Sequence, residues 1–213
     1  MITLPAFVDG HCHLDKTFLG LPWMPHRAAD SVAGRIDAER AMRGTLALPA
    51  YDRAKVLLRK MVAFGTTALR THVDIDTARK LDDLHAILRL REETREHVAM
   101  QIVAFPQSGI LRDPGTYELL DAALGEGADL VGGLDPATID RDPVGQIDAI
   151  LSWSSRAGAS SSADAGRPQA DVPACQAGVT VRSRAAPADA ARAPRSPRRT
   201  RRRRRTSSSA CPW

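Results

Sequence analysis

The first 150 residues alternate between strand-like and helix-like segments, and this alternation restricts the fold more than any other feature. Four short apolar runs are expected to be strands, starting near residues 6, 66, 100 and 129, and the second of them is rich in β-branched residues. Segments with helical spacing of apolar residues lie at 51–64, 77–98, 117–124 and, only just begun, 144–151. Such repeats are typical of parallel βα units. The pattern predicts an α/β protein.

Two α/β architectures fit this period. Four βα units are about half of a (β/α)₈ TIM barrel, whose full length is roughly 250 residues. A small doubly wound sheet would show the same spacing of strands and helices. A long segment, residues 14–49, is irregular and expected to be partly helical. Spacing alone therefore leaves both architectures open.

The composition changes abruptly after Leu151. Residues 1–150 hold 17 Lys and Arg against 22 Asp and Glu, whereas the remainder holds 13 Arg against 3 Asp and is dominated by Ala, Arg, Ser, Pro and Gly. So few large apolar side chains cannot offset the conformational entropy of the chain. We therefore expect a domain over residues 1–151 and a disordered tail over 152–213. G+C-rich DNA read out of frame gives this composition, so we interpret the tail as a frameshift in a truncated barrel gene.

Other features of the sequence indicate a cytoplasmic protein. The three cysteines have no paired spacing, which argues against a disulfide framework. No apolar run approaches the roughly 20 residues of a membrane span, and the first residues do not resemble a signal peptide. We expect no membrane partner.

The segment Asp9-Gly10-His11-Cys12-His13 lies where the first predicted strand ends. Residues i and i+2 of a strand point to the same side, so His11 and His13 can bind one metal ion, and Cys12 points away from them. Barrel enzymes carry their chemistry at this end of their strands. Two surface histidines beside a turn would give the same short pattern, so the spacing alone leaves both interpretations open.

The surrounding residues, from Leu4 to Lys16, resemble the opening metal motif of the amidohydrolase superfamily. Three more motifs follow in order, at residues 70–74, 101–110 and 127–137. Together they resemble the cytosine deaminase-like branch, which includes N-isopropylammelide amidohydrolases, over about residues 4–151. The resemblance implies the first half of a metal-dependent (β/α)₈ barrel. It also implies a hydrolase that cleaves a C–N bond of a pyrimidine- or triazine-like ring with a metal-activated water.

The resemblance also implies roles for particular residues. His11 and His13 would bind one divalent metal ion, zinc or iron, since imidazole suits both. Gln107 would bind the ring, because its amide offers both a donor and an acceptor. His72 and Asp74 would support the metal ligands through hydrogen bonds, although a structural role fits them equally well.

The same resemblance implies that the site is incomplete. Relatives use further histidines, an aspartate and a catalytic glutamate from later strands, whereas no histidine follows His97 in this chain. No catalytic residue can be identified, and we expect the chain alone to be inactive.

Two other functional interpretations remain. The Arg-rich segment from Arg195 to Arg205, which contains the unbroken run Arg201–Arg205, could bind nucleic acid through phosphates, without sequence specificity. Alternatively, another chain could complete a split barrel. An exposed half-barrel could also self-associate through its unpaired strand edges. The expected small-molecule partner remains a nitrogen heterocycle.

Overall fold

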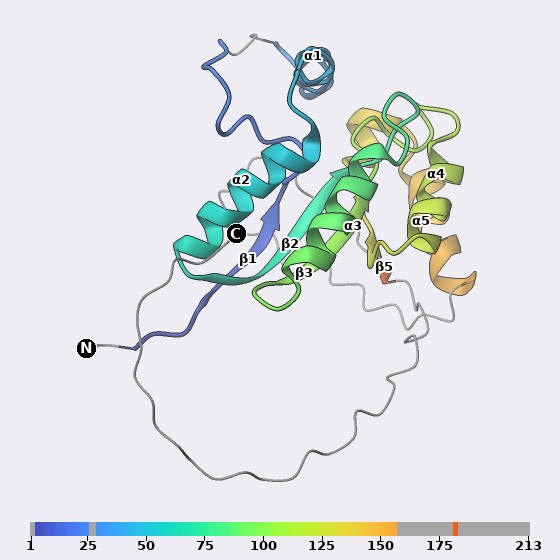
Figure 1. Cartoon of the computed structure of the whole chain (residues 1–213). Coiled ribbons are helices and arrows are strands. Elements are labelled where there is room, and N and C mark those ends of the chain that lie inside the picture. The colour runs from blue at the N-terminus through green and yellow to red at the C-terminus, as the bar shows by residue number, and fades with distance from the viewer. Residues whose placement is uncertain (1–2, 26–28, 157–180, 183–213) are drawn as a thin grey trace, which may run out of the picture.

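The computed structural model describes residues 3–25, 29–156 and 181–182, and its centre is a parallel sheet (Figure 1). Its strands are β1 (Phe7–Cys12), β2 (Thr66–Asp74), β3 (Ala99–Phe105), β4 (Leu130–Val131) and β5 (Val181–Arg182). They lie in the order β1-β2-β3-β4-β5, parallel except for the antiparallel pair of β4 and β5. A doubly wound sheet reverses its strand order, and β1 to β4 do not. The order therefore favours the winding of a barrel.

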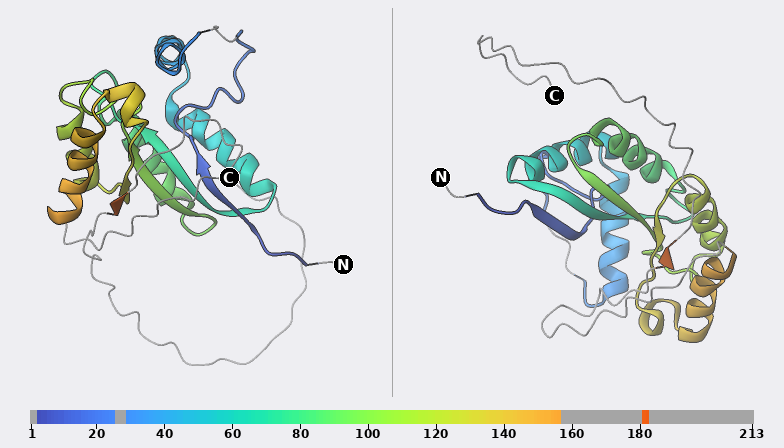
Figure 2. Two further views of the ribbon diagram at one scale, coloured as in Figure 1. Left: turned by 180° about the vertical axis from the view of Figure 1, so that it is seen from behind. Right: turned by 90° about the horizontal axis from the view of Figure 1, so that it is seen from below.

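Helices follow the strands as the sequence predicts. They are α1 (Val32–Gly44), α2 (Ala50–Ala63), α3 (Asp82–Thr94), α4 (Thr116–Gly125), the π-helical η1 (Pro136–Asp140) and α5 (Pro143–Arg156). The sheet is curved, and α2, α3 and α4 lie along its outer face, whereas α1 lies beyond the carboxyl ends of the strands (Figures 1 and 2). The predicted α/β class is therefore confirmed.

The core lies between the outer face of the sheet and these helices. Alternate residues of β2 and β3 point into it: Leu69 and Val73 of β2, and Ile102 of β3, are all buried. The residues between them point to the inner face. The side chains on the inner face meet at the carboxyl ends of the strands, and α1 approaches them there.

The structure departs from the predicted helix over residues 77–98. Helix α3 begins only at Asp82, because a turn precedes it. The Asp76 carboxylate accepts the backbone N–H groups of Ala78 and Arg79 at 2.9 and 2.7 Å, and Lys80 has a φ of +53°. This local hydrogen bonding competes with the first helical turn.

Helix α5 continues past the predicted boundary at Leu151. Trp153 is only 3% exposed and its ring stacks on Tyr117, with centroids 4.5 Å apart. The expected tail otherwise lies outside the described residues, apart from β5. The Arg201–Arg205 run is among the residues outside. None of the helices in the described part of the chain is long and apolar enough to span a membrane.

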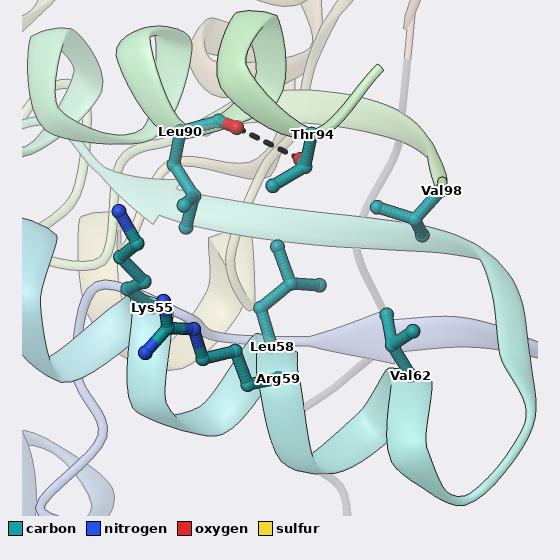
Figure 3. A pocket seen from close by; sticks show the side chains of 7 residues that line it. All are labelled: Lys55, Leu58, Arg59, Val62, Leu90, Thr94 and Val98. Atoms are coloured by element: carbon teal, nitrogen blue, oxygen red, sulfur yellow. Dashed lines mark hydrogen bonds between the residues drawn. The ribbon is translucent and has the colours of Figure 1, made fainter. Parts of the chain in front are cut away.

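A small pocket lies between α2 and α3, on the outer layer (Figure 3). Its lining residues are Lys55, Leu58, Arg59, Val62, Leu90, Thr94 and Val98. Its volume is about 10 Å³, which is room for roughly one water molecule. It is therefore a packing defect between two helices and too small for a ring-shaped ligand.

Candidate functional site

His11 and His13 leave the end of β1 on the same side, as the sequence predicts. Pairing of β1 with β2 shifts between Asp9 and Cys12, so β1 bulges at Gly10 and His11. The Nε2 atoms of the two histidines lie 3.4 Å apart. Two imidazoles bound to one tetrahedral zinc ion at 2.0–2.1 Å would have nitrogens about 3.4 Å apart. The two side chains therefore fit a shared metal ion.

His72 of β2 lies beside this pair. Its ring stacks on His11 with centroids 4.0 Å apart and planes inclined by 22°, and its centroid is 5.5 Å from that of His13. Phe105 of β3 packs edge-on against both His13 and His72. Within the described residues, no group of three or more His, Cys, Asp or Glu side chains is arranged to hold a metal ion. The structure therefore offers a pair of imidazoles, with His72 packed against it.

The three imidazoles are held in their neutral form. Burial is the largest cause, and it lowers the pKa of His13 to about 2 and that of His72 to about 3. The pKa of His11 is lowered for the same reason. The positive charge of Lys16 also disfavours protonation of all three rings. Metal ions bind neutral imidazole, so no proton has to leave before binding at neutral pH.

Cys12 points away from the histidine pair, as predicted. Its Sγ donates to the backbone oxygen of Arg70 at 3.5 Å and the side chain packs against the core. Burial raises the pKa of the thiol to about 12. The thiolate that a metal prefers is therefore strongly disfavoured here.

Asp74 lies at the end of β2, on the inner face of the sheet, and its carboxylate pairs with two cationic side chains. Its Oδ1 is 2.9 Å from Lys16 Nζ, and its Oδ2 accepts from Arg43 Nη1 at 2.6 Å. The structure therefore shows the Asp74 carboxylate paired with Lys16 and Arg43, and its support of the histidines stays a prediction.

Arg43 is the centre of a buried ionic cluster that sequence reasoning missed. Its guanidinium comes from α1 and also contacts Asp15 at 3.3 Å and Asp83 at 2.6 Å. Burial raises the pKa of both Asp15 and Asp74, and the charges of Arg43 and Lys16 oppose this rise. A lone arginine in an irregular segment carries no sequence signal, because its partners are distant in the chain.

Gln107 lies just beyond β3 and is 8% exposed. Its Oε1 accepts from Lys16 Nζ, and its Nε2 donates to Glu39 of α1 at 3.3 Å. A side-chain amide has two N–H donors and two lone pairs, so one of each is left over. Lys16 and Glu39 therefore fix the amide while leaving a donor and an acceptor for a ligand. The sequence reasoning identified Gln107 but neither of these partners.

Comparisons with known proteins bear on this site. No protein family model matches the chain. The N-isopropylammelide isopropyl amidohydrolase of Pseudomonas sp. (strain ADP) is 34% identical over 148 residues, which are 68% of this chain and 37% of that protein. The solved N-isopropylammelide isopropylaminohydrolase of Burkholderia multivorans ATCC 17616 is 48% identical, with a TM-score of 0.67 over 72% of this chain and 38% of that one.

A third relative is a deaminase. The structure of 5-methylcytosine deaminase from Klebsiella pneumoniae, liganded with 5-fluorocytosine, is 31% identical with a TM-score of 0.59, over 73% of this chain and 38% of that one. The N-terminal part of this chain belongs to the cytosine deaminase-like amidohydrolases.

The resemblance inferred from the motifs is therefore confirmed, and so is an α/β fold of the amidohydrolase TIM-barrel type. The names of the relatives describe hydrolases of C–N bonds. The chain spans less than two fifths of the length of these cytosine deaminase-like amidohydrolases.

Proposed function

We propose that the site at the carboxyl ends of β1, β2 and β3 is the first half of a hydrolytic site for a nitrogen heterocycle. The substrate class is a pyrimidine- or triazine-like ring, and the reaction hydrolyses the C–N bond between a ring carbon and an exocyclic nitrogen, so that ammonia or an amine leaves and the oxygen of water is bonded to the ring carbon. His11 and His13 would hold one divalent ion, zinc or iron. Such an ion, when bound, would supply activation of a water molecule.

Other side chains would prepare this site for a ring. Gln107 would bind the amide-like edge of the substrate with the donor and the acceptor that Lys16 and Glu39 leave over. His72 and Phe105 would pack against the imidazole pair and keep its rings in place. Asp74 would hold Lys16 in position through the 2.9 Å ion pair.

The observation that carries this proposal is the 3.4 Å separation of the His11 and His13 Nε2 atoms at the carboxyl end of β1. Two imidazoles leave a tetrahedral ion short of ligands. We therefore propose that the chain alone binds metal weakly and does not catalyse hydrolysis of a heterocyclic substrate. A half-barrel partner chain that supplies the later ligands is the second candidate, because β1 has a neighbour only on its β2 side among the described residues.

We further propose a cytoplasmic protein with a domain over residues 1–151 that helix α5 extends to Arg156. The residues beyond this helix would be a basic, out-of-frame tail that adheres to nucleic acid without specificity. Resequencing the gene from the codon of Pro143 and translating all three frames tests the frameshift. A frame that encodes further histidines and a glutamate supports it, and the absence of such a frame argues against it.

Metal titration of the full chain tests the site itself. Zinc is titrated by calorimetry, and cobalt by its visible spectrum. We expect one weak site, which weakens by at least about tenfold in His11→Ala and in His13→Ala. Cys12→Ala is the matched control, because Cys12 lies between the two histidines but points into the core. Metal binding that is unchanged in both histidine variants would contradict the proposal.

A turnover assay completes this test. The metal-loaded chain is incubated with cytosine, 5-fluorocytosine and N-isopropylammelide, and release of ammonia or isopropylamine is measured. We expect release only after a chain with the remaining strands of a related barrel is added. Turnover by the chain alone would show that the site is complete.

A further inference from the structure

The loop that carries Gln107 is held by a carboxylate from a distant element. Residues 106–112 follow β3, and Asp140 is the last residue of η1. The Asp140 carboxylate accepts three consecutive backbone N–H groups, each at 3.1 Å, from Ile110, Leu111 and Arg112. Three donors on one carboxylate fix both the position and the direction of this stretch of backbone.

The loop is shaped to receive that carboxylate. Gly109 has a φ of +93°, a conformation that L side chains rarely adopt. A Cβ at Gly109 would lie 2.3 Å from Asp140 Oδ1, which is well inside van der Waals contact. A glycine is therefore needed both for the turn and for the close approach of Asp140.

Asp140 is itself held from the other side. Its Oδ2 accepts from Gln146 Nε2 of α5 at 2.7 Å, and Gln146 is 2% exposed. The preceding residue, Ile139, is 3% exposed and packs in a cluster with Phe105 of β3 and Ile36 of α1. The carboxylate therefore joins η1, α5 and the end of β3 into one unit.

We propose that Asp140 is a positioning residue for Gln107. By fixing residues 110–112, it holds the preceding turn, Pro106–Gly109, in a geometry in which the Gln107 amide meets both Lys16 and Glu39. Loss of the carboxylate would free the turn and spread the amide over several orientations. A ring would then bind less tightly. This last step rests on the proposed substrate role of Gln107, whereas the positioning itself does not.

The test follows the Gln107 side chain directly, by ¹H–¹⁵N NMR of the full chain. Gln107→Glu removes the Gln107 side-chain NH₂ signals and thereby assigns them. In Asp140→Asn we expect these signals to shift or broaden. We also expect the amides of residues 110–112 to exchange with solvent at least about tenfold faster, as local opening becomes easier.

The matched control is Asp129→Asn. The Asp129 carboxylate also accepts a backbone N–H group, that of Ile102 at 2.8 Å on the same strand β3, but it does not touch the Gln107 loop. This variant should lose thermal stability and leave the Gln107 signals in place. Gln146→Met is the milder second variant if Asp140→Asn does not fold. It keeps the carboxylate, removes one of its partners, and should move the same signals by less.

Binding of 5-fluorocytosine, followed by ¹⁹F NMR, separates the two proposals. If 5-fluorocytosine binds less tightly to Asp140→Asn and the Gln107 signals also move, both the positioning role of Asp140 and the substrate role of Gln107 are supported. Moved signals without binding by the wild-type chain support the positioning and contradict the proposed substrate role. Unmoved Gln107 signals in a folded Asp140→Asn or Gln146→Met variant would overturn the positioning role, whatever the thermal stability.

Discussion

Arg43 of α1 donates to the carboxylate of Asp74 at the end of β2 across 2.6 Å, and both side chains are almost completely buried. This bond is one of several that join the irregular segment between β1 and α2 to the sheet. It also fixes Asp74, whose other oxygen pairs with Lys16. The position of Lys16, and through it that of Gln107, therefore depends on how α1 docks.

Replacing Arg43 should release this helix. Arg43→Met leaves three carboxylates, those of Asp15, Asp74 and Asp83, in a buried position without their common cation. We expect a loss of about 3–5 kcal/mol in the free energy of unfolding, because the three carboxylates would then be buried without a neutralising charge. Urea unfolding measures this loss. Arg35→Met is the control on the exposed side of α1 and should change stability by less than about 0.5 kcal/mol. Equal losses would contradict the role of the cluster.

Acid should destabilise the chain through His72. Burial lowers its pKa to about 3, against about 6.5 in the unfolded chain. The unfolded state therefore binds more protons between these values. The stabilising effect of the neutral ring is present above pH 6.5 and is lost as the pH falls toward 3. Between pH 7 and pH 5 this group alone should lower the free energy of unfolding by about 2 kcal/mol.

The variant His72→Phe isolates this effect, because it keeps an aromatic ring and removes the titrating group. Its free energy of unfolding should fall by about 2 kcal/mol less than that of the wild type between pH 7 and pH 5. Val73→Ala, a core substitution on the same strand, should instead lower stability equally at both pH values. A His72→Phe variant with the wild-type pH dependence would show that His72 is not neutral in the fold.

Local patterns were enough to predict strands β1 to β4, most helices and the histidine pair. The i, i+2 spacing of His11 and His13 places both rings on one side of a strand in any sheet, so no tertiary information is needed. Helix α3 was predicted too long, because the Asp76 turn depends on one side chain rather than on periodicity. Strand β5 was not predicted, because it falls in the segment after Leu151, whose few large apolar residues led us to expect disorder there.

The ionic part of the site could not be predicted for a different reason. Arg43 reaches Asp15, Asp74 and Asp83, which belong to three separate segments. Only the packing of α1 over the sheet brings these charges together, and nothing in the spacing of residues 14–49 encodes that packing. The same holds for Asp140, whose partners lie in the loop after β3.

Gly109→Ala should destabilise the loop that carries Gln107. The alanine backbone would have to adopt a positive φ. Its methyl group would also collide with Asp140 Oδ1, 2.3 Å away. The strained backbone alone costs about 1–2 kcal/mol, so the total loss should exceed about 1 kcal/mol in chemical unfolding. Gly125→Ala is the control, because nothing lies within 4 Å of its Cβ position at the end of α4. That variant should be neutral or more stable by up to about 1 kcal/mol. The prediction fails if both variants have the same stability.

Filling the pocket between α2 and α3 should stabilise the domain without touching the site. Val62→Ile adds one methylene toward the pocket of about 10 Å³ that Val62 lines with Leu58 and Val98 (Figure 3). Burying a methylene contributes about 0.8 kcal/mol, provided that the neighbouring side chains do not have to move. Val56→Ile is the control on the same helix, where the side chain is 42% exposed and outside the pocket. Thermal unfolding of the two variants should show a higher Tm for Val62→Ile only. A lower Tm for Val62→Ile would mean that the two helices already pack too closely there to accept a larger side chain.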